Sequence, residues 1–288
     1  IYLQELKGFK KHISDAEIKK HIIETSIYGV DIDAGAVDIA RLRFWLSLVV
    51  DEHVPQPLPN LDFKIVCANT LIPLGSFTEL DLNEKAGKAV MELEDLRHDF
   101  FDVSSEDKLN LERQFRKIQT DLLSLRDLAS KANYEIYTKL YQFNPFEDSP
   151  CTWFDAWWMF GVNDGFDIVI GNPPYGAKLS ADDKKLYYSI YKHQDYQLDT
   201  YLLFIEKSFQ MMKPNAVNAF IIPNTWLINL KLEKFRKYIV DHNTILNIVH
   251  YHKSVFENAV VDTQVVIFKK QISNNNLVQI LEYIDIEK

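Results

Sequence analysis

The sequence predicts an α/β protein built around a doubly wound, largely parallel sheet. Short apolar runs rich in β-branched residues alternate with stretches of helical spacing, as expected for parallel strands joined by helices. Three of the predicted strands end on polar residues, at Asp31, Asn69 and Asn172. Between 76 and 150 the strand-like runs stop, which indicates an insertion of different character.

Residues 1–75 are predicted to form the first part of the domain. Two helices are expected within residues 1–26, with Ser14 and Glu17 at the spacing of a capping box. A strand over 27–33 is expected to lead into a helix over 34–52, followed by a second strand over 61–69.

Residues 76–150 are predicted to form an antiparallel helical hairpin inserted into the domain. The first helix is expected over 84–101, and Ser104 and Asp107 have the spacing of a cap for the second. Apolar residues of the second helix recur at steps of four and three, which is the seam of a packed helix: Leu111, Phe115, Ile118, Leu122 and Leu125. The hairpin is interpreted as a structural brace rather than a binding arm.

Residues 151–288 are predicted to complete the domain. Its strands and helices are expected over the following ranges: strand 167–171, helix 200–213, strand 217–223, helix 232–240, strand 245–252 and strand 263–270.

Composition narrows the class of protein. The 288 residues are 47% hydrophobic, enough for one large α/β domain or two modest ones. No apolar run approaches the roughly 20 residues that span a bilayer, and no signal peptide opens the chain. Cys67 and Cys151 are predicted to be reduced thiols of a cytoplasmic protein, and no Cys/His spacing predicts a metal site. A net charge of −9 argues against a general nucleic-acid coat protein, although a local basic face would still suit an enzyme.

The stretch DIVIGNPPYG carries the clearest chemical signal. Asn172 precedes a proline and is therefore confined to extended backbone. Its side-chain oxygen and the carbonyl of Pro173 are two fixed acceptors, which suit both hydrogens of a planar NH2 group. Binding both hydrogens favours a tetrahedral nitrogen with a free lone pair, and Tyr175 offers a face for the ring that carries the amine. The alternative is an ordinary Pro-Pro turn with a surface tyrosine.

The other strand ends suit a nucleoside site, although an acid that closes a strand is as often simply solvated. Ligands of open α/β sheets bind beyond the carboxyl ends of the strands, where an acid such as Asp31 holds the two ribose hydroxyls. Taken alone, Asn69 is a weaker signal still and is better explained as a turn residue.

With these motifs in order, the chain resembles the gamma-class N6-adenine DNA methyltransferases. GFDIVIGNPPYG lies between IYGVDIDAGAVDIARLRFWLSL and FIIPNTWL, an arrangement similar to the methylase parts of type IIG restriction–modification enzymes and related phage-defence methylases. The resemblance covers nearly the whole chain. It implies a Rossmann-like S-adenosylmethionine-dependent fold with an antiparallel last strand.

The resemblance also implies roles for individual residues. Asp31 would bind the ribose of S-adenosylmethionine, Ile32 would pack on its adenine, and Asn69, where many relatives carry Asp, would meet the adenine amine. Asn172, Pro173, Pro174 and Tyr175 would form the catalytic turn, in which Asn172 and Pro173 accept from the target N6 and Tyr175 stacks on the flipped base. Phe256 would stack on the other face of that base, with core packing as the alternative.

The sequence departs from the family pattern at both ends. The sequence starts at Ile1, in the helix that follows the glycine-rich cofactor loop in relatives. That loop and its strand, expected between the strands that end at Asp31 and Asn172, are therefore expected upstream of Ile1 in a larger protein. A slot of about 9–10 Å between those two strands is therefore expected. After the last strand a target-recognition domain is expected, and a nuclease domain of the same parent protein is a further possible partner. Two alternatives stay open: a glutamine-amide N5 methyltransferase, and a fragment that only binds DNA or a partner.

Overall fold

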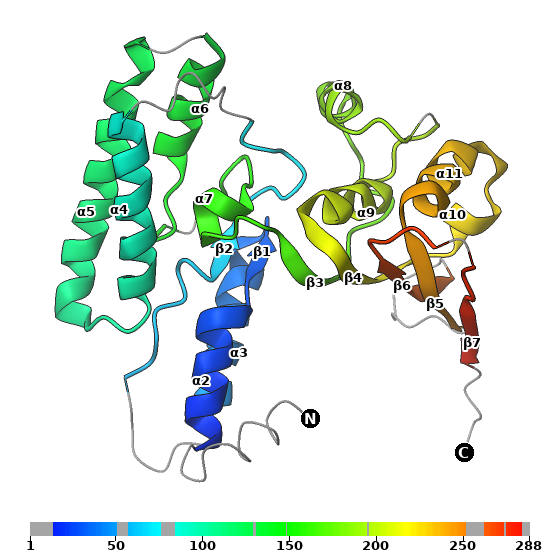
Figure 1. The fold of residues 1–288 in the computed structure, drawn as a ribbon, viewed down its shortest axis with the longest axis horizontal. Coiled ribbons are helices and arrows are strands. Elements are labelled where there is room, and N and C mark those ends of the chain that lie inside the picture. Colours follow the sequence, from blue (N-terminus) through cyan, green and yellow to red (C-terminus); the bar gives the residue numbers. More distant parts are fainter. Residues whose placement is uncertain are drawn as a thin grey trace. The chain divides into compact units, whose positions relative to one another are not determined.

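The computed structural model describes residues 14–50, 57–75, 84–128, 131–147, 149–194, 196–251, 262–273 and 275–283 (Figure 1). The chain divides into two compact units, Ile1–Gly161 and Val162–Lys288. In the described part of the chain, no helix is both long enough and apolar enough to cross a membrane. The predicted three-part division into 1–75, 76–150 and 151–288 stays a prediction.

The first unit combines a small parallel sheet with helices. Its elements are α2 (Asp15–Ser26), β1 (Gly29–Asp31), α3 (Ala34–Val49), β2 (Ile65–Cys67), α4 (Glu84–Phe100), α5 (Ser105–Ser124), the 3-10 helix η2 (Arg126–Leu128), α6 (Lys131–Gln142) and α7 (Ala156–Phe160). Strands β1 and β2 pair in parallel, with Asp31 opposite Cys67 at their carboxyl ends. Both strands are shorter than the sequence predicted.

Side-chain caps fix where the helices of this unit begin. Ser14 and Glu17 form the predicted capping box, in which the Glu17 amide donates to Ser14 Oγ at 3.1 Å. Helix α3 begins after Asp33, whose Oδ1 accepts from the Ala36 amide at 3.0 Å. Because the cap lies two residues beyond β1, the chain leaves the strand and enters the helix almost without a loop.

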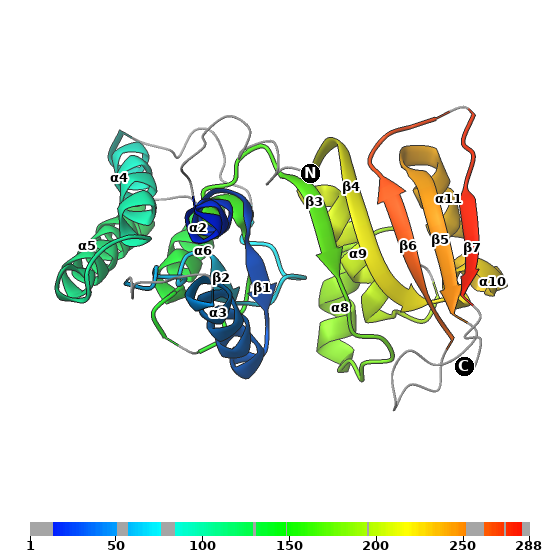
Figure 2. The same cartoon turned by 90° about the horizontal axis from the view of Figure 1, so that it is seen from below.

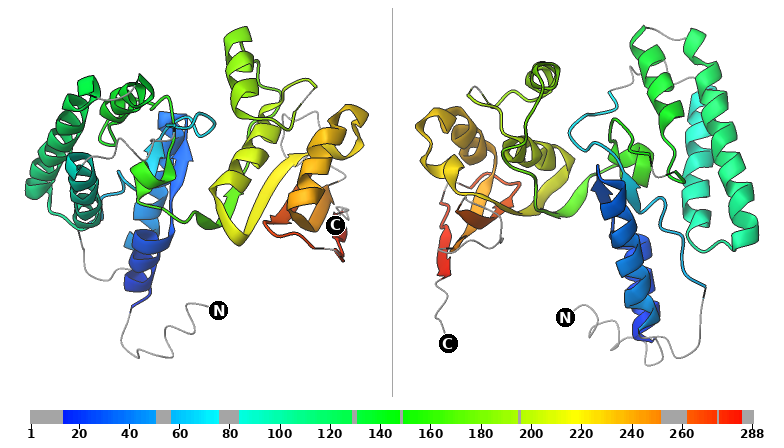
Figure 3. Two further views of the ribbon diagram at one scale, coloured as in Figure 1. Left: turned by 45° about the horizontal axis from the view of Figure 1, so that its top comes forward. Right: turned by 180° about the vertical axis from the view of Figure 1, so that it is seen from behind.

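The insertion contains the predicted hairpin and one further helix. Helices α4 and α5 lie side by side (Figures 1 and 3). Four of the five seam residues are buried: Phe115, Ile118 and Leu122 on α5, and Leu125 at its C-cap. Helix α6 was not predicted. The buried Gln119 on α5 donates from Nε2 to the carbonyl of Leu140 at 2.7 Å, and this bond joins α6 to the hairpin.

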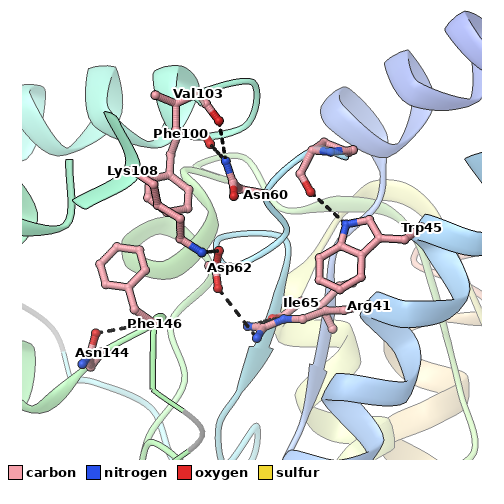
Figure 4. Close-up of polar contacts among 11 residues, drawn as sticks. Arg41, Trp45, Asn60, Asp62, Ile65, Phe100, Val103, Lys108, Asn144 and Phe146 are labelled. Atoms are coloured by element: carbon pink, nitrogen blue, oxygen red, sulfur yellow. Dashed lines mark hydrogen bonds and ion pairs between the residues drawn. The ribbon is translucent and has the colours of Figure 1, made fainter. Parts of the chain in front are cut away.

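A polar network joins the insertion to the small sheet (Figure 4). The Asp62 carboxylate accepts from Lys108 Nζ at 3.1 Å and lies 3.8 Å from the Arg41 guanidinium. Arg41 also donates to the carbonyl of Ile65 at 2.8 Å, while Asn60 Nδ2 donates to the carbonyl of Phe100 at 2.9 Å. These contacts fix α3 and the α4–α5 connection against the segment that enters β2.

The second unit is a five-stranded sheet with helices. Its elements are β3 (Phe166–Gly171), α8 (Ala181–Ile190), α9 (Thr200–Met211), β4 (Met212–Pro223), α10 (Thr225–Ile228), the 3-10 helix η3 (Leu230–Leu232), α11 (Glu233–His242), β5 (Thr244–Tyr251), β6 (Thr263–Lys269) and β7 (Gln279–Tyr283). The strand order is β3-β4-β6-β5-β7 (Figure 2). Strand β6 is antiparallel to both of its neighbours, whereas β3 with β4 and β5 with β7 are parallel pairs.

This topology confirms an α/β fold with a mostly parallel sheet and an antiparallel strand over 263–269. Strand β7, which follows it, was not predicted. Strand β4 is longer than expected, because it begins at Met212 directly after α9.

Helices α9 and α11 pack on one face of the five-stranded sheet (Figure 2), with Phe209 and Phe235 buried against Phe220 and Phe268. Strand β3 is an edge strand, and its side chains Ile168 and Ile170 are 68% and 75% exposed. Strands β1 and β3 belong to different sheets and are not paired with each other. The expected slot between them stays a prediction, since the two strands lie in separate units.

Candidate active site

The turn after β3 presents the NPPY residues at the carboxyl edge of the five-stranded sheet. Asn172 is exposed, and its side-chain amide makes no hydrogen bond to another described residue. Pro173 is buried, and Tyr175 is half-buried against the core formed by α9, α11 and β4. The turn therefore combines a free amide with a ring whose inner edge is anchored by packing.

The start of α9 holds this turn through two hydrogen bonds. Thr200 Oγ1 donates to the carbonyl of Pro174 at 2.6 Å, and the Gly176 amide donates to Asp199 Oδ1 at 3.1 Å. Sequence reasoning missed both Asp199 and Thr200. The partners lie 26 and 23 residues apart, and nothing local in the sequence signals such a contact.

The end of β1 presents the Asp31 carboxylate to solvent. Its Oδ1 accepts from the Asp33 amide at 2.9 Å, which fixes the carboxylate while Oδ2 stays available. The carbonyl of Asp31 accepts from the Ala68 amide at 2.8 Å, so the β1 and β2 ends lie together. Ile32, the next residue, is 59% exposed, so its apolar side chain is accessible beside the end of β1.

Asn69 follows β2 and closes a turn. Its Oδ1 accepts from the Leu71 amide at 3.1 Å, and its own amide donates to the carbonyl of Cys151 at 2.9 Å. The turn role considered from the sequence is therefore present. A side-chain carbonyl oxygen has two lone pairs, so the same Oδ1 is able to accept a second hydrogen bond.

These residues fit an adenine nucleoside. A carboxylate with a free oxygen suits a ribose diol, an exposed isoleucine suits the face of a purine, and an amide oxygen suits an exocyclic amine. Asp31, Ile32 and Asn69 lie together in the first unit, whereas Asn172, Pro173, Pro174 and Tyr175 belong to the second. Their union in one pocket stays a prediction. Phe256 lies outside the described residues.

Among the residues that the structure describes, no group of three or more His, Cys, Asp or Glu side chains is placed to hold a metal ion. Cys67 and Cys151 are both buried, and neither forms a disulfide. Burial raises the pKa of the Cys151 thiol to about 11, so this group stays protonated at neutral pH.

Comparison with known proteins identifies the family. The chain is 26% identical over 340 residues to a type II restriction enzyme and methyltransferase of Methanocaldococcus jannaschii, covering 93% of this chain and 28% of that protein. It is 27% identical over 292 residues to RM.Eco57I of Escherichia coli, covering 95% of this chain and 22% of that protein.

The chain thus spans about a quarter of the length of these relatives. Among solved structures, it is similar to a class I S-adenosylmethionine-dependent methyltransferase from Listeria monocytogenes, with 13% identity, a TM-score of 0.35 and coverage of 87% of this chain and 74% of that one. Residues 25–256, well over half of the chain, match one protein family throughout. The chain belongs to the Eco57I restriction-modification methylase family.

Proposed function

We propose that this chain is the catalytic core of a restriction–modification DNA methyltransferase that methylates the N6 amine of a flipped adenine. One observation carries the proposal: a free, exposed Asn172 amide at the end of β3, followed by a buried proline and a core-packed tyrosine. Family membership supports the same reaction class.

The proposed role of the turn is to hold and activate the amine. Asn172 Oδ1 and the carbonyl of Pro173 each accept one hydrogen of N6, which draws the nitrogen toward tetrahedral geometry and frees its lone pair. Tyr175 stacks on the purine and holds it outside the DNA double helix. This contact offsets part of the few kcal/mol that base flipping costs. Positioning of this kind supplies a large share of the rate enhancement in reactions between two bound partners.

Asp31, Ile32 and Asn69 are the proposed cofactor residues. Asp31 Oδ2 accepts from the ribose hydroxyls, Ile32 covers the adenine face, and Asn69 Oδ1 accepts from the adenine amine. Bound S-adenosylmethionine supplies an electrophilic methyl group, and its transfer to N6 with loss of one N6 proton leaves the thioether S-adenosylhomocysteine.

We propose that this chain is part of a longer protein with further domains. Because the chain corresponds to about a quarter of its relatives, we propose double-stranded DNA, a target-recognition domain and a nuclease domain of the same parent protein as its partners. A DNA substrate and reduced thiols suit the cytoplasmic location expected from the sequence.

Asn172→Ala in the parent protein tests the acceptor pair. Transfer of labelled methyl groups to DNA should fall at least about 100-fold, since removal of one charge-stabilising contact at a reacting atom has effects of this size. Cofactor affinity, measured by calorimetry, should change less than about threefold. Asn276→Ala, which alters an exposed asparagine of the same unit, is the control. Near-normal turnover of Asn172→Ala would refute the assignment.

The same labelled cofactor, offered with a glutamine-bearing peptide, separates the proposal from its main alternative. Labelling of the peptide and not of DNA would identify a glutamine-amide methyltransferase.

Phe256 is proposed as the second stacking ring. Its replacement by Ala should weaken binding of DNA with a mismatched adenine by about 1–3 kcal/mol, whereas replacement by Trp keeps a stacking face and should be far milder. Equal affinities of the Ala and Trp variants in a fluorescence titration would assign Phe256 to core packing.

A further inference from the structure

The turn that carries the NPPY residues is held by hydrogen bonds to the first residues of α9, which are distant in the sequence. Asn172 and Pro173 lie before the held segment, Tyr175 lies inside it, and Thr200 and Asp199 bind its two ends at Pro174 and Gly176. The backbone on either side of Tyr175 is therefore tied to the same two consecutive residues.

Asp199 differs from most polar N-caps of the described helices, although Asn224 before α10 also makes no side-chain cap. Ser14, Asp33, Asp155 and Ser180 each accept a hydrogen bond from an amide of their own helix. Asp199 occupies the equivalent position of α9 but makes no side-chain cap. Its carboxylate accepts from Gly176 instead. Since a side-chain cap stabilises a helix, the Asp199 carboxylate stabilises the turn instead of the start of α9.

Gly176 supplies the backbone geometry that this contact requires. Its φ of +67° lies in the left-handed region that glycine adopts freely, and a Cβ there would meet nothing within 4 Å. Glycine at this position is thus explained by the left-handed backbone conformation rather than by lack of space for a side chain. In this conformation the Gly176 amide points toward the Asp199 carboxylate.

Helix α9 is a rigid support for these contacts. Thr200 is only 5% exposed, and the next residues, Tyr201 and Leu202, belong to the hydrophobic core of the second unit. Tyr201 also forms a hydrogen bond of 3.1 Å between its hydroxyl and Thr225 Oγ1, at the start of α10. Because α9 is packed into the core, a turn that is hydrogen-bonded to the start of α9 is held in place relative to the core.

We propose that Asp199 and Thr200 are positioning residues that hold the turn between Pro174 and Gly176, and with it the Tyr175 ring and the Asn172–Pro173 acceptors. This inference rests on the proposed function for its catalytic consequence. Neither side chain touches the reacting atoms. The turn would otherwise have to order itself each time a base arrives, and misplacement by about 1 Å can cost on the order of 100-fold in rate.

Thr200 variants of the parent protein test the catalytic consequence. Thr200→Val keeps the branched shape but removes the O–H donor, and should lower single-turnover methyl transfer at saturating DNA and cofactor by at least about tenfold. Thr200→Ser restores the donor and should return the rate to within about threefold of the native protein. Thr138→Val is the control, since Thr138 donates to its own helix at Tyr134. Melting temperature and both dissociation constants should stay unchanged in all three.

Native-rate transfer by Thr200→Val would overturn the inference, as would equal losses in the Val and Ser variants. A loss of rate that follows a fall in melting temperature would also overturn it, because the role would then be structural.

Hydrogen exchange separates this inference from the proposed function. Asp199→Ala should speed exchange of amides in a peptide covering 172–180 by at least about tenfold, because Gly176 loses its acceptor. Asp199→Asn keeps Oδ1 and should exchange as the native protein does. Unchanged exchange in Asp199→Ala would overturn the positioning contact whatever the activity. A native parent protein that methylates no DNA, together with faster exchange in Asp199→Ala, would reject the proposed function and leave the contact supported.

Discussion

Three asparagines show how the same side chain takes different roles in this chain. Asn60 donates to the carbonyls of Phe100 and Val103, so its amide fixes the backbone of the insertion. Asn69 uses its oxygen to close a turn beside the end of β2. Asn172 makes no side-chain hydrogen bond to a described residue. An amide without a partner at the end of a core strand is available for a ligand, which is why Asn172 carries the proposed chemistry.

Asp62 illustrates a charge whose role is structural. Its side chain and that of Arg41 are each 13% exposed, and Lys108 completes the group. Asp62→Asn should lower the free energy of unfolding by about 2 kcal/mol, because it leaves the Arg41 cation largely buried without a counter-charge. Glu92→Gln, which breaks an exposed pair with Lys88, should change it by less than about 0.5 kcal/mol. Urea unfolding of both variants measures the difference, and equal effects would contradict the buried role of Asp62.

At the scale of elements, local sequence signals predicted what local interactions determine. The cap at Ser14 and the apolar seam of α5 are set by residues three or four apart, and both were predicted correctly. Strand β7 was missed because all five of its residues are exposed, so its side chains show no alternation. It is a strand only because its backbone pairs with β5, which no local pattern reveals.

The residues of the candidate site show the same difference between local sequence signals and long-range contacts. Asp31, Asn69 and Asn172 were predicted because each ends a strand, and strand ends are readable from apolar runs. Asp199 and Thr200 were not, since their contacts with the turn depend on how α9 packs across the sheet.

Gly165 tests a long-range constraint at the start of β3. Its φ is +90°, and a Cβ would lie 2.6 Å from the carbonyl oxygen of Met211, where α9 ends and β4 begins. Gly165→Ala should therefore destabilise the second unit by roughly 3 kcal/mol or more, through strain and a clash with backbone. Gly75→Ala also has a positive φ but meets Ile136 only at 3.5 Å, so strain alone should cost about 1–2 kcal/mol. Denaturant unfolding gives both values, and a Gly165→Ala effect no larger than that of Gly75→Ala would mean that β3 and β4 separate easily.

At the scale of the whole molecule, each unit has buried clusters of its own. Trp226 is the only tryptophan of residues 162–288 and lies in the core of the second unit, whereas Trp153 and Trp158 are buried in the first. Unfolding of the two units is therefore separable by fluorescence when Trp226 is replaced by Phe. A change confined to one unit should alter one transition.

Titration of Lys64 with pH should change the stability of the first unit alone. Burial lowers the pKa of its amine from 10.5 to about 8, despite a favourable position 4.2 Å from the centre of the Tyr28 ring. Between about pH 8 and 10.5 the unfolded chain then binds more protons at Lys64 than the folded chain does. Stability must rise with pH in that window, since proton release accompanies folding.

From pH 7.5 to 9.5 the free energy of unfolding of the first unit should rise by about 1 kcal/mol from this group, a value discounted because the amine is only partly buried. Burial raises the pKa of Tyr28, so this group acts in the opposite direction, because the unfolded chain loses the Tyr28 proton first. Its ordinary pKa of 10.0 lies above this range, so the opposing effect is small. Lys64→Met should abolish the rise, whereas Lys88→Met, at a largely exposed lysine, should retain it. Because Lys64 lies in the first unit, the transition of the second should respond equally to pH in all three proteins. A rise that survives in Lys64→Met would assign the pH dependence to another group, and one that appears in both transitions would show that the two units unfold together.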